Sequence, residues 1–447
     1  MKSADILLAI SLALVPFGSL RLAAQINDTQ IAEPAEFSPS LAPADQVTVS
    51  TPVTYAALAS SQQAGDGYSV SLLNGTSQLK LLGSFSALTI FSTDRPFAPG
   101  LPLFLLPESP FGLETNTFDI HARQSNIGAI FTGPPAGAFT PSATFLAFIA
   151  NDSLTGDSYG FLPYNAYGEL KNEDWRFAAG LQNDVFNPRK PTSVSLAVMF
   201  TSGNTGSFRS QARIERQYGS ATTNALQFQF AISDPIQSVI VTRDTRIQED
   251  NGWPNIEGRV NAGLGPMEQL VGNRTARPLE LGVSGFVGQL RTTRSILSPP
   301  DPQSPIREIA DCWGLGIDTA LNLTDAIGLQ GELFTGAGLG EYNGGIGQTY
   351  DSAAMRSIRS SGGWGEFFVY LNPQLHLHTG YGIDAPLRRS GDSYLITENQ
   401  TWYANLVWNC TKNVQISNQI DFRSTHYRDP LLDAKGVIFY TEFLWRF

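Results

Sequence analysis

From Ser77 to its last residue, the chain alternates apolar and polar side chains in short segments separated by turn residues. Residues 226–233 read Leu-Gln-Phe-Gln-Phe-Ala-Ile-Ser, and residues 313–318 read Trp-Gly-Leu-Gly-Ile-Asp. A period of two predicts strands with one apolar face and one polar or small face. Because every segment carries its own apolar band, the pattern predicts a closed antiparallel β-barrel that spans a membrane. A soluble β-sandwich is the alternative, but it needs only one apolar core and leaves edge strands to be protected.

The pattern divides into about sixteen strands, at 77–92, 115–133, 143–150, 161–171, 174–182, 208–219, 223–233, 254–264, 278–291, 310–324, 326–337, 361–373, 375–385, 399–412, 413–427 and 435–447. Long and short connections alternate between them, as outer loops and periplasmic turns do in barrels of this kind. The inner connection 265–277 is the one overlong turn. The even strand number predicts that both ends of the barrel lie on the periplasmic side. The third outer loop, 183–207, is predicted to fold inward and narrow the channel.

The first 24 residues have the features of a secretory signal peptide. Lys2 precedes an apolar stretch from Ile6 to Leu20, and residues 22–24 form a small-residue cleavage site. After this segment no apolar run reaches the 18 residues that a spanning helix needs. Its removal leaves 27 basic and 39 acidic residues, a formal charge of −12, which argues against a nucleic-acid partner.

Residues 25–76 differ in composition from the rest of the chain. They are rich in Pro, Ala, Ser, Gln and Asp, and they show no period of 2 or 3.6. We therefore predict a flexible periplasmic extension at 25–76, followed by the barrel at 77–447. The two cysteines, Cys312 and Cys410, fall at opposite membrane levels in this strand map, so no disulfide is predicted between them.

The final segment places aromatic side chains at alternate positions up to the last residue. Phe439, Phe443, Trp445 and Phe447 share one face. This pattern resembles the assembly signal of bacterial outer-membrane barrels, which implies recognition by the barrel assembly machinery. Aromatic residues near strand ends also suit the interfacial girdle of such barrels.

The polar strand faces are predicted to line a water-filled channel, where charged side chains can select solutes. The predicted lumen residues are Arg123, Arg176, Arg209, Arg213, Arg259, Asp318, Glu332 and Glu366, with Asp184, Asn187, Arg189 and Lys190 in the constriction loop. Arg123 reaches the lumen only if a bulge near Gln124 turns it inward. A wall of arginines facing a wall of carboxylates would orient dipolar solutes, and arginine suits carboxylate ligands. The alternative is that these charges pair with one another, as the proximity of Arg213 to Glu215 suggests.

Space in the lumen is indicated by small residues on the predicted inward faces. These are Gly180, Gly314, Gly316, Gly380 and Ser417. They predict an open pore.

Several stretches resemble the DcaP-like trimeric porins of Gram-negative outer membranes. The residues are Phe118–Ser125, Asn165–Leu170, Gly180–Gln182, Asn255–Arg259, Leu279–Leu281 and the glycine-spaced 316–338. The resemblance implies a homotrimer of sixteen-stranded barrels with an inward-folded third loop, and passage of small organic anions such as dicarboxylates. Residues 25–76 lack the coiled-coil-like pattern of the family, and Asn126 stands where the family often has a basic residue.

The pattern predicts an outer-membrane diffusion channel surrounded by lipid, with no enzymatic activity and no cofactor or metal. His376 and His378 share a strand face, but no third ligand motif accompanies them. A barrel lipase would need a nucleophile and a base on the lipid-facing side, whereas His121, His376 and His378 fall on lumen faces. A structural or adhesive barrel, whose lumen would be blocked by side chains, is the other alternative.

Overall fold

A computed structural model describes residues 67–107, 115–150, 160–234, 253–293, 307–351 and 353–447. The chain divides into two units, 1–53 and 54–447, and the first lies wholly outside the described residues. The predicted signal peptide and residues 25–66 of the predicted extension are likewise outside them.

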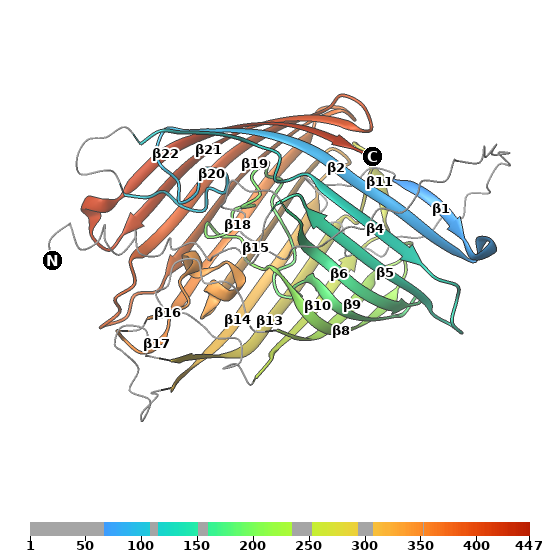
Figure 1. Ribbon diagram of the computed structural model, residues 1–447, viewed down its shortest axis with the longest axis horizontal. Coiled ribbons are helices and arrows are strands. Elements are labelled where there is room, and N and C mark those ends of the chain that lie inside the picture. Colours follow the sequence, from blue (N-terminus) through green and yellow to red (C-terminus); the bar gives the residue numbers. More distant parts are fainter. Residues whose placement is uncertain (1–66, 108–114, 151–159, 235–252, 294–306, 352) are drawn as a thin grey trace, which may run out of the picture. The chain divides into compact units, whose positions relative to one another are not determined.

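The described part of the second unit is a ring of antiparallel strands. In chain order they are β1 (Tyr68–Leu72), β2 (Ser77–Ser92), β3 (Thr117–His121), β4 (Asn126–Thr132), β5 (Thr140–Phe148), β6 (Leu162–Lys171), β7 (Trp175–Asn183), β8 (Phe208–Gly219), β9 (Ala225–Ser233), β10 (Asn255–Leu264), β13 (Leu279–Thr293), β14 (Arg307–Asn322), β15 (Ile327–Ala337), β18 (Arg359–Tyr370), β19 (Leu375–Pro386), β20 (Ile396–Asn409), β21 (Val414–Tyr427) and β22 (Ala434–Arg446). From β2 onward each barrel strand pairs with the next along the chain, and β22 pairs with β2 to close the ring, as Figure 1 shows.

The predicted sixteen-stranded antiparallel barrel is confirmed among the described residues. The sheet has eighteen strands, two more than the predicted sixteen. One predicted strand is interrupted at residues 122–125 and forms both β3 and β4, and β1 is an additional short strand that is not part of the closed ring. β1 pairs with the first part of β2, in line with the end of β22. It therefore uses residues 68–72 of the predicted extension to continue the seam beyond Phe447.

The two faces of the strands differ as their sequence pattern predicts. On β14, Leu315 and Ile317 are 57% and 56% exposed, whereas Asp318, the residue after Ile317, is 1% exposed. Exposed aromatic and aliphatic side chains recur on the outer face of the other strands. Apolar groups therefore face outward, and polar and charged groups face the interior of the ring.

The connections at one end are tight turns and those at the other end are long. The tight turns include 172–174, 220–224, 371–374 and 410–413. The overlong inner turn 265–278 contains the small hairpin of β11 (Glu268–Leu270) and β12 (Arg274–Ala276). The long end carries the hairpin of β16 (Tyr350–Asp351) and β17 (Arg356–Ser357), and the 3-10 turns η4 (Leu339–Tyr342), η5 (Gly345–Gly347) and η6 (Pro430–Leu432). Within the described residues, no helix is long and apolar enough to cross a membrane.

Candidate functional site

The inward faces of the strands carry the charged residues that the sequence pattern assigns to the lumen. Arg176, Arg209, Arg213, Arg259, Asp318, Glu332 and Glu366 all lie there, with between 1% and 8% of their surface exposed. Arg123 lies in the interruption between β3 and β4, where it is buried and its Nη2 is 2.5 Å from Asp119 Oδ2. Between the pairs Leu88–His121 and Ser84–Asn126, four residues face three of β2, so the condition named for Arg123, a bulge near Gln124, is met.

The connection between β7 and β8, residues 184–207, which we call L3, runs along the inside of the wall. It begins at an ion pair in which Arg209 Nε donates to Asp184 Oδ1 over 2.6 Å. The backbone N–H of Val185 donates to Glu257 Oε2 over 2.8 Å. At residue 186 the Phe side chain packs against Phe286 and Tyr342, with ring centroids 5.0 and 5.4 Å away.

L3 then crosses the inward side of β15, β18 and β21. The backbone N–H of Arg189 donates to Glu332 on β15, and that of Thr192 donates to Glu366 on β18 over 2.6 Å. Further on, the N–H of Val194 donates to Gln419 on β21 over 2.8 Å. The carboxylates and amides of the wall thus accept the backbone donors of a segment that forms no regular ladder of its own.

The predicted opposition of a basic and an acidic wall is wrong for these residues. Arg259 on β10 forms an ion pair with Asp318 on β14, 2.8 Å between Nη2 and Oδ1, because only β13 separates the two strands. Asp318 Oδ1 also accepts from Arg189 Nε over 2.7 Å. The carboxylates therefore hold L3 and its neighbours instead of presenting a free negative surface.

The inward glycines of β14 do not leave the open space predicted for them. A Cβ atom at Gly314 would collide with the rings of Phe286 and Phe186, and one at Gly316 would collide with the amide of Asn187. These positions accommodate L3. The lumen beside β14 is therefore filled by the loop.

Positive charge gathers where β6, β7 and β8 lie side by side, in a group that we call the basic cluster. It consists of Lys171, Arg176 and Arg213, with the carboxylates of Glu169 and Glu215 between them. Three cations share two carboxylates, so the cluster carries one excess positive charge. Lys190 of L3 does not join it, since its Nζ donates to Thr205 O over 2.7 Å.

Several residues that shape the lumen were missed in the sequence. Tyr342 in η4 stacks under the Arg209 guanidinium, 3.9 Å from its ring centroid, and donates to Glu257. It lies in the glycine-rich stretch 338–347. An aromatic residue among glycines could have indicated that this loop packs in a tight space.

The long connections also pack together at their end of the barrel. Leu103 and Phe104 from the β2–β3 connection form a buried cluster with Ala197 of L3 and Ile346 of η5. Nearby, Asp351 accepts hydrogen bonds from Ser393 and from two backbone N–H groups. Burial opposes its ionisation, but these hydrogen bonds outweigh that effect and lower the pKa of Asp351.

The histidine pair predicted on one strand face is joined to L3. His376 Nδ1 lies 2.7 Å from His378 Nε2, and His378 Nδ1 lies 2.8 Å from Glu366 Oε1. Among the described residues, no group of three or more His, Cys, Asp or Glu side chains could hold a metal ion. The pair therefore supports the carboxylate that accepts from Thr192.

The aromatic residues of the final segment lie on the outward face of β22, the strand that pairs with β2 at the closing seam. Phe439, Phe443 and Trp445 point outward, and Trp445 stacks on Phe85 with centroids 5.7 Å apart. Phe447 also packs against Phe85, at 5.6 Å.

Comparison with solved structures identifies the class of fold. The outer membrane channel DcaP of Acinetobacter baumannii shares 11% identity, with a TM-score of 0.61 over 85% of this chain and 99% of that chain. The anion-selective porin of Comamonas acidovorans matches with 11% identity and a TM-score of 0.51, over 83% and 100% of the chains. The trimer form of the outer membrane protein OmpT of Vibrio cholerae matches with 10% identity and a TM-score of 0.51, over 83% and 99%.

The chain therefore has the fold of the outer-membrane porins, and the predicted resemblance to the DcaP-type barrel is confirmed at the level of fold. No protein-family model and no curated protein sequence matches it.

Proposed function

We propose that this protein is a porin of the bacterial outer membrane, through which small hydrophilic solutes diffuse. The observation that carries the proposal is the separation of the two strand faces around a closed ring. The outer face offers apolar side chains to lipid, and the inner face offers charged and amide groups that water can solvate. L3 lies against the inner wall, where it would set the width of the path.

A preference for small organic anions, dicarboxylates among them, is the finer part of the proposal. It is supported by the excess positive charge of the basic cluster, since guanidinium groups bind carboxylate oxygens in pairs. The anion-selective porin of Comamonas acidovorans, which has a similar fold, is consistent with it.

The same proposal includes the assembly and the ends of the chain. A homotrimer is supported by the trimer form of the Vibrio cholerae protein. We propose that residues 1–24 are a signal peptide, that 25–76 extend into the periplasm, and that the aromatic residues of β22 are recognised by the barrel assembly machinery.

Single-channel conductance in a planar bilayer, with a salt gradient, tests the proposal. We expect stepwise channels with anion preference in the wild type. Arg213→Gln should lower the anion-to-cation permeability ratio by up to about 30-fold, because a unit positive charge about 4 Å away favours an anion by about 1 kcal/mol in water and disfavours a cation by about as much. Arg216→Gln, which removes the same charge from the outward face of the same strand, is the matched control. A cation preference in the wild type would remove the anion claim.

A structural or adhesive barrel is the second candidate. It is favoured by the small exposed fraction of the inward charges and by the loops packed into the long-loop end. Correctly folded barrels that never conduct would support this candidate and contradict the porin.

A further inference from the structure

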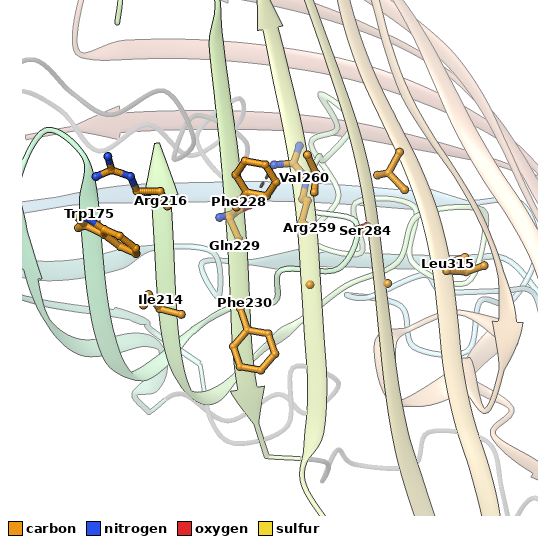
Figure 2. A pocket seen from close by; sticks show the side chains of 13 residues that line it. Trp175, Ile214, Arg216, Phe228, Gln229, Phe230, Arg259, Val260, Ser284 and Leu315 are labelled. Atoms are coloured by element: carbon orange, nitrogen blue, oxygen red, sulfur yellow. Dashed lines mark hydrogen bonds between the residues drawn. The ribbon is translucent and has the colours of Figure 1, made fainter. Parts of the chain in front are cut away.

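The outer face of β8 to β14 contains an open groove where two glycines face each other. Gly258 on β10 pairs directly with Gly285 on β13, and both are on the outward side. Phe230 is the cross-strand partner of Gly258 on one side, and Leu315 is the partner of Gly285 on the other. Figure 2 shows these apolar side chains around the hollow.

The groove has the volume of a ligand site. It measures about 540 Å³, within the range of roughly 300–1,000 Å³ typical of small-molecule pockets. Its floor is open at Gly258 because glycine has no side chain there. A Cβ atom at this position would meet only the Gln229 carbonyl oxygen, 3.9 Å away. Most of its walls are apolar, from Ile214, Phe228, Val260 and Val283 in addition to the partners of the glycines.

One end of the groove carries a basic side chain on a face that is otherwise apolar. Arg216 lies three residues before the end of β8, next to the tight turns. Its guanidinium carbon is 4.8 Å from the ring centroids of both Trp175 and Tyr218, and its Nη1 is 2.8 Å from Asp174 Oδ2. Asp174 has 58% of its side chain exposed, and a guanidinium has five N–H donors, so Arg216 can bind a second anion beside Asp174.

This arrangement matches the two parts of a membrane lipid. A cation on the outer face of a barrel is costly at the middle of the bilayer and cheap near its edge, where headgroups lie. Aromatic rings occupy the same level, as Trp175 and Tyr218 do here. Guanidinium groups bind phosphate oxygens in pairs, and apolar walls with a glycine floor suit an acyl chain.

We propose that this groove binds an anionic glycerophospholipid of the leaflet at the tight-turn end of the barrel. Its phosphate contacts Arg216, and one acyl chain lies over Gly258 and Gly285. The inference rests on the proposed function, because it needs this outer face to be in a membrane.

Native mass spectrometry of the full-length protein in detergent, titrated with phosphatidylglycerol, tests the site. We expect one tightly held lipid per chain in the wild type. Arg216→Gln should weaken binding about tenfold, the effect of one charge-assisted hydrogen bond. Gly258→Leu fills the groove floor and should weaken it by a similar factor.

Two controls match these variants on other parts of the outer face. Gly365→Leu adds the same side chain at an exposed glycine of β18 with nothing within 4 Å of its Cβ position. Lys435→Gln removes an exposed charge near the start of β22, beside the long loops. Both should bind phosphatidylglycerol as the wild type does. Equal heat-modifiability on gels establishes that all four variants are folded.

Unchanged affinity in both Arg216→Gln and Gly258→Leu would overturn the inference. Full competition by inorganic phosphate would also overturn the inference, because it would show a site for free anions. A changed trimer-to-monomer ratio in Gly258→Leu without loss of lipid would overturn it as well, because it would show that a second copy of the chain occupies the groove. Conductance of the same samples separates the lipid proposal from the porin proposal. Channels that conduct but bind no phosphatidylglycerol would contradict only the lipid site. Barrels that bind phosphatidylglycerol but do not conduct would contradict only the porin function.

Discussion

Replacing Glu366 with Gln tests whether the wall carboxylates hold L3 in place. Glu366 accepts five hydrogen bonds, two of them from the backbone N–H and the hydroxyl of Thr192 at 2.6 and 3.0 Å. A glutamine of the same shape has one acceptor oxygen and one donor nitrogen. Whichever way its amide turns, one of the two oxygens facing Thr192 becomes an N–H group.

The loss can be estimated from the hydrogen bonds of this site. A hydrogen bond to a charged group contributes about 1.5–3 kcal/mol. Losing one on L3 should therefore raise the population of the released loop roughly 10- to 150-fold. Single-channel recordings should show this as more frequent transitions between conductance levels.

Glu442→Gln is the matched control for this experiment. Glu442 also lies on an inward strand face, but its carboxylate accepts from Ser86 on β2 and, among the described residues, from no group of L3. Its channels should switch as the wild type does. If Glu366→Gln, folded and conducting, switched no more often than the wild type and Glu442→Gln, the reasoning that this carboxylate holds L3 would be refuted.

Three further predictions concern single residues. Arg209→Gln leaves the Asp184 carboxylate buried without its cation, which should lower the free energy of unfolding by about 3–5 kcal/mol in denaturant titrations of the detergent-solubilised protein; a loss below about 1 kcal/mol would contradict the pairing. Because the pKa of Asp351 is lowered, its hydrogen bonds from Ser393 stabilise the long loops fully above about pH 4, the ordinary pKa of a free Asp, and this stability is lost as the pH falls through the lowered pKa. Hydrogen exchange should therefore show the long loops opening in acid. Asp351→Asn should remove that pH dependence. Deleting Phe447 removes its contact with Phe85 at the seam and should slow barrel formation in an in vitro assembly assay, with unchanged rates as the contradicting result.

The strands could be predicted from the sequence because a period of two is a local property. Each outward residue, such as Leu315, needs only its own neighbours to show that its face is apolar. The interruption at residues 122–125 was not predicted, because one strand was predicted over 115–133 and a bulge near Gln124 was only the condition for an inward Arg123. The overlong 265–277 turn was located, but its small hairpin was not, because three-residue strands carry too little periodic signal.

The partners of the lumen charges could not be predicted in this way. Arg259 and Asp318 are 59 positions apart, and their pairing depends on which strands are neighbours in the closed ring and on the register between them. The filling of the space beside Gly314 by Phe186 depends in turn on the path of L3. A small residue on an inward face indicates that something approaches closely, and it does not distinguish water from a loop.

The basic residues of the lumen therefore fall into two groups, according to whether their removal leaves a buried carboxylate without a cation. Arg209 and Arg259 neutralise Asp184 and Asp318, so replacing either leaves a buried carboxylate unpaired, and any change in ion preference would be mixed with loss of structure. Arg213 shares Glu215 with Arg176, at 3.4 and 3.0 Å, so Glu215 keeps a cation when Arg213 is replaced. Selectivity and stability can be separated at Arg213 for this reason. A selectivity test needs a charge whose removal does not destabilise the fold. In this lumen the basic cluster of β6–β8 contains such a charge, Arg213.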